Sequence, residues 1–506
     1  MMAAAAISLG RVLDVLRRHE LLIELHGPED VAISGVSQDS RSVRPGDLFL
    51  AWKGTEMDAH DFVRAAEDGG AAAAVVERVV DGAALPQIRV SNGRRAAAIV
   101  AMEILGAPGS GFLLTAITGT NGKTTTALLT RYLLGADEPS VALGTLGLVG
   151  ADGEVREGQG GLTTPGPVEL ARLFQQLAAE GVRRVTMEAS SHALDQHRLD
   201  GIRPDVAVFT NLTRDHLDYH GTFEAYREAK LRLFELLADD GTAVVHAGDP
   251  SWSDLLPRAA RLRRVYIDAS THPEPKWPEG EILPDLVAQG LLLSGTGSRF
   301  LLTESGDSVT VTLPLLGRFN VENALCAAGV ARAAGLSLAE IAERLREVPS
   351  PPGRLELIAH RPVPVVLDYA HTPDALARAL ETLRPLYRGR LIVVFGAGGD
   401  RDREKRPEMG RAASNGADLP IVTSDNPRTE DPEAIVDQIV AGVSEPFRRI
   451  VDRREAIEAA LREARPGDVI LLAGKGHERY QVVGTERRPF DEREIVREAV
   501  DRLGAA

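Results

Sequence analysis

The chain has 506 residues, of which 26% are charged and 44% are hydrophobic, and its formal net charge is −15. These fractions are typical of globular proteins, and the length is too great for one ordinary hydrophobic core, so we expect two to four domains. The negative charge argues against a general nucleic-acid-binding protein, whose surface would carry a basic stripe or domain.

No membrane anchor or secretion signal is predicted. No apolar run approaches the ~18 residues that span a bilayer. The first apolar residues are too few for a signal-peptide core, and an amphipathic stretch, Leu9–Leu25, follows them. Cys326 is the only cysteine, which excludes an intrachain disulfide and a cysteine-rich zinc site. We expect a cytoplasmic protein without membrane insertion.

Proline and glycine clusters divide the chain at two places. Residues 107–111 (Ala-Pro-Gly-Ser-Gly) follow a helix predicted over Arg94–Leu105, and residues 348–353 (Val-Pro-Ser-Pro-Pro-Gly) follow a second helical pattern. Both clusters are typical of linkers. We therefore predict three domains of ordinary size, which cover residues 1–108, 109–348 and 349–506.

The second and third domains alternate short β-rich runs with helical patterns. The alternation predicts an α/β fold with parallel, helix-covered sheets and with ligands at the carboxyl ends of strands. The Pro- and Glu-rich stretch Ser270–Gly280 is expected to be an exposed loop. The predicted strands are Phe112–Thr118, Arg184–Met187, Val206–Phe209, Leu391–Phe395 and Val469–Leu472, and the helix after the first of them covers Thr124–Leu134.

A phosphate-binding loop is predicted where the second domain begins. The loop, Gly119-Thr120-Asn121-Gly122-Lys123-Thr124-Thr125, joins a predicted strand to a predicted helix. Backbone N–H groups in such a loop cradle phosphate, Lys123 would reach the terminal phosphates, and the Thr124 hydroxyl would help to hold Mg²⁺. The spacing is shortened, because Ile117 stands where the usual first glycine would be. The alternative is an ordinary turn.

This loop resembles the shortened G-T-N-G-K-T loop of the Mur ligase family, and the resemblance continues through all three domains. It implies a UDP-binding N-terminal α/β domain, a central P-loop ATPase-like domain with a parallel sheet, and a Rossmann-like C-terminal domain. It also implies ATP and Mg²⁺ as cofactors. The implied ATP contacts are Gly119, Thr120, Asn121, Gly122, Lys123, Thr124, Thr125, Asn320, Arg354, Asp368 and His371.

The substrate residues are implied by the same resemblance. The segment Asp39-Ser40-Arg41-Ser42 reads by itself as a turn before a strand, but in the family it marks the uridine-diphosphate site, with Ser40 as the best candidate contact. The residues that resemble those gripping the muramoyl peptide are Thr163, Thr164, Ser190, Gln196 and Arg198.

Metal ligands are expected after the next two predicted strands. Glu188 follows one strand and His216 follows the other, and both resemble metal ligands of the family. Mg²⁺ prefers oxygen ligands, and by spacing alone the histidines between residues 192 and 220 could equally suggest zinc. Local hydrogen bonding is the alternative role for His192, His197 and His220.

Lys230 falls within the apolar stripe of a helix predicted over Thr222–Phe234. A desolvated lysine has a lowered pKa and is partly neutral, although a lysine at the edge of a stripe can also extend to solvent. In Mur ligases a lysine in this Ala-Lys-x-x-x-Phe setting becomes a carbamate. The resemblance therefore implies that Lys230 is carbamylated and joins Thr124, Glu188 and His216 as a metal ligand.

Two clusters in the third domain, residues 396–407 and 424–428, each follow a predicted strand and suggest an amino-acid site. Asp425-Asn426-Pro427-Arg428 resembles the signature of the family members that add diaminopimelate. Diaminopimelate differs from lysine by a second carboxylate, and a guanidinium binds carboxylate in a paired manner. We assign Arg428 and Arg401 to that carboxylate and Asp425 and Glu478 to the ammonium. The remaining candidate contacts are Asn426 and Gly474.

The resemblance implies an ATP-dependent, ADP-forming ligase of peptidoglycan synthesis. It would add meso-diaminopimelate to UDP-N-acetylmuramoyl-L-alanyl-D-glutamate through an acyl phosphate, with catalytic roles for Lys123, Glu188, His216 and Lys230. Arg428 argues against L-lysine as the alternative substrate. Folate polyglutamylating ligases lack the first domain, and a Mur-like amidotransferase subunit would need a cysteine-rich zinc insert. We expect a monomer.

Overall fold

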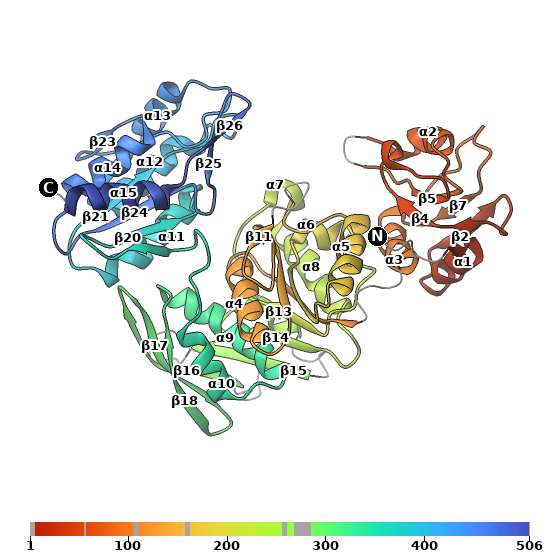
Figure 1. The fold of residues 1–506 in the computed structure, drawn as a ribbon, viewed down its shortest axis with the longest axis horizontal. Coiled ribbons are helices and arrows are strands. Elements are labelled where there is room, and N and C mark those ends of the chain that lie inside the picture. Colours follow the sequence, from red (N-terminus) through yellow and green to blue (C-terminus); the bar gives the residue numbers. More distant parts are fainter. Residues whose placement is uncertain are drawn as a thin grey trace. The chain divides into compact units, whose positions relative to one another are not determined.

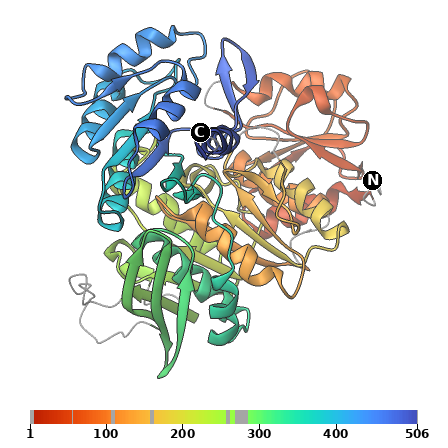
Figure 2. The same cartoon turned by 60° about the vertical axis from the view of Figure 1, so that its left-hand side comes forward.

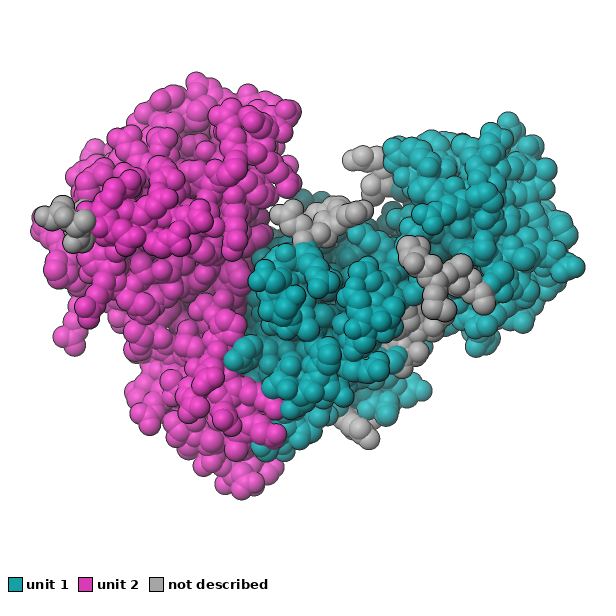
Figure 3. All heavy atoms as spheres, viewed as in Figure 1, with its two compact units in different colours: residues 1–286, 325–337 teal, residues 287–324, 338–506 magenta. Residues whose placement is uncertain are grey.

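The computed structural model describes residues 6–54, 57–105, 111–156, 162–255, 261–267 and 285–504. The chain forms two compact units (Figure 3), one of residues 1–286 with 325–337 and the other of residues 287–324 with 338–506. The first predicted linker, apart from Gly111, and the predicted loop Ser270–Gly280 lie outside the described residues. None of the described helices is long and apolar enough to cross a membrane.

The first part of unit 1 is a five-stranded sheet with helices on both faces. Helices α1 (Leu9–Arg18) and α3 (Gly93–Ile104) pack on one face, and α2 (Val63–Asp68) packs on the other. The amphipathic stretch 9–25 is thus divided between α1 and β2. All neighbours except β2 and β7 are parallel. The sheet order is β2 (Leu22–His26), β7 (Gln87–Val90), β6 (Ala73–Val76), β5 (Asp47–Leu50) and β4 (Gly35–Ser37).

The central sheet of unit 1 positions the phosphate loop (Figure 1). Its parallel strands confirm three predicted strands to within a residue. Two short strands, β10 (Gly147–Val149) and β11 (Val155–Arg156), extend it in the antiparallel direction. The parallel strands lie in the order β9 (Ser140–Gly144), β12 (Arg184–Glu188), β8 (Leu113–Thr118), β13 (Val206–Phe209), β14 (Thr242–His246) and β15 (Arg261–Ile267).

Helices follow the central strands and cover the sheet. The predicted helix after the phosphate loop is α4 (Lys123–Gly135), which packs on β8, β9 and β12. Side chains of α5 (Pro167–Ala179) and α8 (Phe223–Glu235) share a core cluster with Leu114 and Ala116 of β8. Two short helices, α6 (Ser191–Asp195) and α7 (Leu217–His220), carry polar residues that follow β12 and β13.

Unit 2 contains an antiparallel element that the predicted parallel sheets did not include. Strands β16 (Leu286–Ser294), β17 (Gly297–Glu304) and β18 (Asp307–Leu313) are joined by tight turns (Figure 2). Ser305 and Gly306 have φ values of 51° and 93° between the paired residues Glu304 and Asp307. Positive φ at both central residues characterises the two-residue hairpin turn whose twist matches that of its strands.

The C-terminal sheet of unit 2 is parallel except for β19. Helices α11 (Pro373–Leu383), α12 (Lys405–Gly416) and α13 (Pro432–Val440) cover one face. Helices α14 (Arg453–Glu463) and α15 (Glu492–Gly504) cover the other. The sheet order is β19 (Glu356–Ala359), β20 (Val365–Asp368), β24 (Val469–Ala473), β21 (Leu391–Phe395), β22 (Leu419–Val422) and β23 (Arg448–Arg449).

Candidate active site

The phosphate loop is held in shape by the end of the neighbouring strand β13. Gly119 and Gly122 have φ values of 147° and 85°, where glycine is favoured. A Cβ on Gly119 would lie 1.9 Å from the Thr210 hydroxyl. That hydroxyl donates to the Asn121 carbonyl at 2.8 Å, and the Asn121 N–H donates to the Asn211 side chain at 3.0 Å. The shape of the phosphate loop therefore depends on its hydrogen bonds with the residues that follow β13.

Positive charge gathers at this loop. The Lys123 ammonium donates to the Gly119 carbonyl at 3.0 Å and to the Thr120 carbonyl at 2.9 Å. Lys123 is also the first residue of α4, so its charge coincides with the unpaired N–H groups and positive dipole end of that helix. This arrangement fits a phosphate chain.

Glu188 lies beside the start of α4 and presents its carboxylate oxygens to Thr124. It is 1% exposed, and its carboxylate accepts from the Thr124 hydroxyl at 2.8 Å and from the Thr145 N–H at 2.9 Å. Gly144 is required there, because a Cβ would lie 2.0 Å from the Glu188 carboxylate. A hydroxyl and a carboxylate next to a phosphate loop are a donor set that fits Mg²⁺. Thr145 was not among the predicted residues, since its sequence carries no motif.

Lys230 is buried rather than extended to solvent. Its side chain is 1% exposed, its ammonium donates to the Gly119 carbonyl at 2.7 Å, and it lies 4.6 Å from the centre of the Tyr226 ring. Burial lowers the pKa of the Lys230 amine well below its usual value, and the charge of Lys123 lowers it further, while Asp215 acts in the opposite direction. The alternative that Lys230 extends to solvent is therefore wrong, and the burial expected from the family resemblance is confirmed.

The histidines gather with two tyrosines near α7. The His192 ring lies 4.8 Å from His216, 4.2 Å from Tyr219 and 5.5 Å from His220. Burial, followed by the neighbouring histidines, lowers the pKa of His192. Within the described ranges no three or more His, Cys, Asp or Glu side chains are grouped so as to hold a metal ion.

The other predicted histidine roles differ from residue to residue. His216 has a φ of 52° at the start of α7, and its side chain is about half exposed. In the described part of the chain it forms no hydrogen bond with Glu188 or Lys230, so its metal role stays a prediction. His197 has the local role considered as its alternative, because its Nδ1 lies 2.9 Å from the Asp200 carboxylate.

Four of the predicted substrate residues form one connected group. Thr164 bonds Ser190 at 3.3 Å, and its carbonyl accepts from the Arg198 guanidinium at 2.9 Å. The Arg198 guanidinium also donates to the side-chain carbonyl oxygen of Gln196 at 2.7 Å. Tyr219, which was not predicted, accepts from the Gln196 amide at 3.1 Å. Thr163 contacts a different neighbour, since its hydroxyl lies 3.3 Å from that of Thr145.

Ser40 lies in a capped turn of the first sheet. It begins a short 3₁₀ helix whose N-cap, Asp39, accepts from the Arg41 N–H. Gln38, two residues earlier, lies against Gly166, where a Cβ would be 3.3 Å from the Gln38 side chain. Gly166 follows Thr164 by two residues, so the candidate UDP and peptide residues belong to neighbouring segments of unit 1.

The residues of unit 2 that are predicted to bind ATP are held by contacts with the backbone and with an aromatic ring. Asn320 is 1% exposed and donates to the Leu316 carbonyl at 2.8 Å. The Asp368 carboxylate accepts from the Leu355 and Ala370 N–H groups at 2.8 and 2.9 Å, and burial raises its pKa. The Arg354 guanidinium lies 5.1 Å from the Tyr369 ring.

His371 adjoins these residues in the loop after β20. Its Nδ1 lies 2.8 Å from the Tyr369 carbonyl, and its own carbonyl accepts from Lys405 at 3.1 Å. The next residues begin α11, with the Thr372 hydroxyl as N-cap and Pro373 at the first position, which are the residue types that favour a helix start.

The residues predicted to bind the amino-acid substrate lie in the loops at the carboxyl ends of β22 and β24. Arg428 has a φ of 52°, and its guanidinium donates to the Gly399 carbonyl at 2.7 Å, which leaves further N–H groups available. Gly474 has a φ of 118°, and a Cβ on it would lie 2.4 Å from the Asp425 carboxylate. Asn426 donates to Glu478 at 2.8 Å, whereas Arg401 is exposed.

The partly buried His477 is expected to make the stability of unit 2 depend on pH. Its pKa is lowered to about 4, first by burial and then by the charges of Arg354 and Arg493. The unfolded histidine, with a pKa of 6.5, therefore binds more protons than the folded one between these values, and stability should fall as the pH drops through this window. We expect His477→Gln to remove about 2 kcal/mol of that loss, after allowance for partial exposure.

Urea denaturation at pH 7 and pH 4.5 measures this difference. The exposed His360 offers a matched control, and His360→Gln should keep the wild-type dependence on pH. The same loss of stability in His477→Gln as in wild type would contradict the assignment.

Three family matches cover most of the chain. Residues 117–331 match the Mur ligase middle domain, residues 353–476 match the Mur ligase glutamate ligase domain, and residues 32–102 match the Mur ligase family catalytic domain. The UDP-N-acetylmuramoyl-L-alanyl-D-glutamate--2,6-diaminopimelate ligase of Gloeobacter violaceus is 43% identical over 499 residues, which cover 96% of this chain and 98% of that protein.

The chain belongs to the Mur ligase family.

This Mur ligase is also 44% identical over 472 residues to the protein of the same name from Bradyrhizobium diazoefficiens, covering 92% and 95% of the two chains. A solved structure of a UDP-N-acetylmuramoyl-L-alanyl-D-glutamate--2,6-diaminopimelate ligase has a TM-score of 0.72 at 34% identity and covers 99% of both chains. The fold is shared by the MurF ligase of Thermotoga maritima in complex with ADP, with a TM-score of 0.61 at 20% identity over 93% of this chain and 98% of that one.

These similarities confirm the family and the α/β fold class expected from the motifs. As a Mur ligase the chain is an enzyme, an ATP-dependent ligase that forms ADP. The roles of individual site residues stay predictions.

Proposed function

We propose that this Mur ligase joins an amino group of meso-diaminopimelate to the free carboxylate of UDP-N-acetylmuramoyl-L-alanyl-D-glutamate. The observation that carries the proposal is Arg428, whose guanidinium is oriented by the Gly399 carbonyl in the same group of loops as Asp425 and Glu478. A guanidinium can form a paired contact with the second carboxylate, which is the feature that distinguishes diaminopimelate from lysine. The carboxylates of Asp425 and Glu478 can bind an ammonium of the same molecule. The relatives that carry this name support the same substrate.

The reaction proceeds in two balanced steps. The carboxylate of the D-glutamyl residue attacks the γ-phosphorus of ATP, which gives an acyl phosphate and ADP. The amine then attacks the acyl carbon, an amide forms, and phosphate and a proton leave. Lys123 and the N-terminus of α4 stabilise the negative charge that develops on the transferred phosphoryl group. The connected group of Thr164, Ser190, Gln196 and Arg198 orients the peptide.

Thr124 and Glu188 would hold Mg²⁺ at the phosphate loop. Bound there, the ion would supply charge neutralisation between the carboxylate and the γ-phosphate. His216 and a carbamylated Lys230 would hold a second ion. Lys230 suits carbamylation because its lowered pKa leaves a neutral amine, which is the form that attacks carbon dioxide. We further propose that the enzyme acts in the cytoplasm as a monomer.

Carbamylation of Lys230 can be tested without activity. In the presence of Mg²⁺ and ¹³C-bicarbonate, the wild-type protein should show a carbamate carbon signal by NMR that Lys230→Met lacks. Lys405→Met is the matched control, because Lys405 is a second lysine with a lowered pKa, at a different place, and it should keep the signal. A wild-type spectrum without a carbamate signal would contradict this role.

The overall proposal is tested by the mass of the product. A reaction with ATP, Mg²⁺, the UDP-linked dipeptide and meso-diaminopimelate should give a UDP-linked tripeptide and one ADP per amide. Omission of either the UDP-linked dipeptide or meso-diaminopimelate should stop ADP formation. ADP formation that does not depend on the UDP-linked dipeptide would contradict the proposal.

A further inference from the structure

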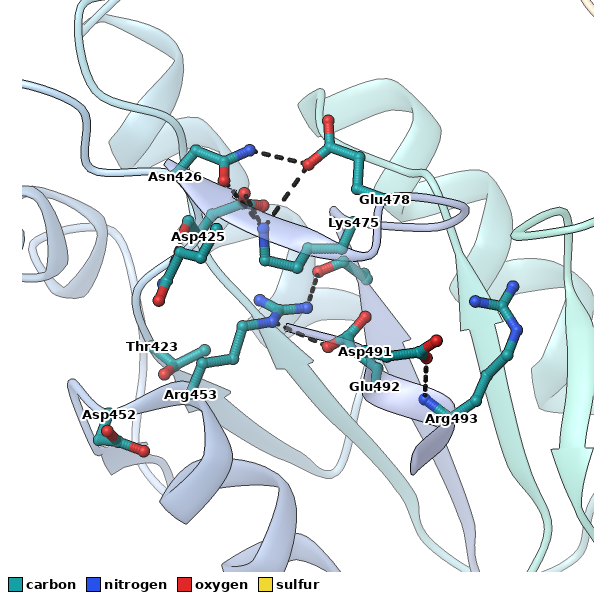
Figure 4. A network of polar contacts seen from close by, with 12 residues as sticks. Thr423, Asp425, Asn426, Asp452, Arg453, Lys475, Glu478, Asp491, Glu492 and Arg493 are labelled. Atoms are coloured by element: carbon teal, nitrogen blue, oxygen red, sulfur yellow. Dashed lines mark hydrogen bonds and ion pairs between the residues drawn. The ribbon is translucent and has the colours of Figure 1, made fainter. Parts of the chain in front are cut away.

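Lys475 is completely buried among residues assigned to the amino-acid site, and no role has yet been given to it. It follows β24, and Figure 4 shows its side chain directed at Asn426, Asp425 and Glu478. The ammonium donates to the Asn426 side-chain oxygen and to the Tyr480 carbonyl, both at 2.9 Å. It also lies 3.6 Å from the carboxylates of Asp425 and Glu478.

These contacts leave Lys475 with no donor for a ligand. An ammonium has three N–H groups and no acceptor; two of them serve Asn426 and Tyr480, and the third faces the two carboxylates. Lys475 is 0% exposed, so its influence on a bound molecule must pass through its neighbours. It therefore cannot be a contact residue of the amino acid.

The orientation of Asn426 depends on Lys475. The Asn426 side-chain oxygen accepts from Lys475 and also from the Val482 N–H, each at 2.9 Å. A reversed amide would direct its NH₂ group at two donors, so the observed orientation is the only one that satisfies them. The NH₂ group is thereby directed at Glu478, to which it donates at 2.8 Å. Lys475 thus fixes Glu478 both directly and through Asn426.

The charge of Lys475 also allows two carboxylates to stand close together. Asp425 and Glu478 both lie 3.6 Å from the same ammonium, so the three groups together carry one net negative charge. The nearby buried Arg453 is already paired with Glu492 at 2.8 Å (Figure 4). Without the ammonium, the two carboxylates would repel one another, and one of them would turn away or take up a proton.

We propose that Lys475 is a positioning residue that holds Asp425 and Glu478 as the ammonium-binding side of the amino-acid site. This inference rests on the proposed function and identifies what organises its specificity. The single negative charge left over matches one ammonium of the amino acid, whose carboxylate lies at Arg428.

Lys475→Met, which keeps the apolar stem and removes the charge, tests the proposal. We expect the KM for meso-diaminopimelate to rise by about 10- to 100-fold, as for the loss of charged hydrogen bonds, while kcat and the KM values for ATP and the UDP-linked dipeptide stay within about threefold. Arg454→Met is the control, because Arg454 is an exposed cation of the same unit paired with Glu498, and it should change nothing. Should Lys475→Met fail to fold, Lys475→Gln keeps a donor without the charge and carries the same test.

A double variant separates positioning from a general structural role. If Lys475 acts through Glu478, Lys475→Met should raise KM less than about threefold when introduced into Glu478→Gln, since contacting residues that act together are not additive. Three results would each overturn the proposal. The KM effects of the two substitutions could multiply in the double variant, the KM for meso-diaminopimelate could fall in Lys475→Met, or Lys475→Met could raise the KM values of all three substrates equally. If the wild-type enzyme used another amino acid, the proposed function would fail, and the KM for that amino acid would still test Lys475.

Discussion

Lys123→Ala should lower kcat by about 10²- to 10³-fold, the usual effect of removing one stabilising contact to developing charge. The reason is that Lys123 is a cation of the phosphate loop, and its ammonium donates to two carbonyls of that same loop. The thermal unfolding midpoint should therefore change little. Phosphate release at saturating substrates measures kcat, and thermal unfolding monitored by circular dichroism measures folding.

Arg183→Ala is the matched control for this variant. Arg183 is an exposed cation just before β12, at the end of that strand opposite to Glu188. Its removal should leave kcat unchanged. Wild-type turnover in a folded Lys123→Ala protein would remove Lys123 from the catalytic role.

Arg428→Ala should raise the KM for meso-diaminopimelate by about 30- to 100-fold, because a paired guanidinium–carboxylate contact is lost. The KM for ATP should stay within about threefold, since among the described residues the hydrogen bonds of Arg428 join the loops after β21 and β22 to the segment Val482–Gly484. Arg428→Lys should recover only part of the loss, because an ammonium cannot form two parallel bonds. Initial rates at varied substrate concentrations give both KM values.

Arg449→Ala provides the control for Arg428. Arg449 is a surface arginine of the same sheet, paired with Glu433 and Asp437, and surface pairs contribute little to stability. Equal increases in the KM values for ATP and for diaminopimelate after Arg428→Ala would mean that the amino-acid site has been placed wrongly.

Local sequence predicted the elements whose chemistry is itself local. The helix start at Thr372 and Pro373 and the glycines of the phosphate loop follow from the backbone geometry that those residues favour. The spacing of Lys230 placed it within an apolar stripe, but it left open whether the side chain would be buried or would reach solvent. Each of these features depends on residues a few positions apart, which one sequence can display.

Contacts between distant loops could not be predicted in the same way. Thr145 and Tyr219 take part in the site through strand order and helix packing. Lys475 stands between two predicted site residues, Gly474 and Glu478, but its position beside the Asp425 and Glu478 carboxylates depends on how the loops after β22 and β24 meet. The antiparallel strands β16–β18 were missed because the surrounding βα alternation dominated the pattern.

The choice of amino acid tests the central claim most directly. Phosphate release should be measured with ATP, Mg²⁺ and UDP-N-acetylmuramoyl-L-alanyl-D-glutamate, with either meso-diaminopimelate or L-lysine as the amino acid. We predict turnover with meso-diaminopimelate and little or none with L-lysine, which lacks the carboxylate assigned to Arg428. Turnover with L-lysine but not with meso-diaminopimelate would contradict the assignment of the amino-acid site. No turnover with either amino acid would contradict the proposed function.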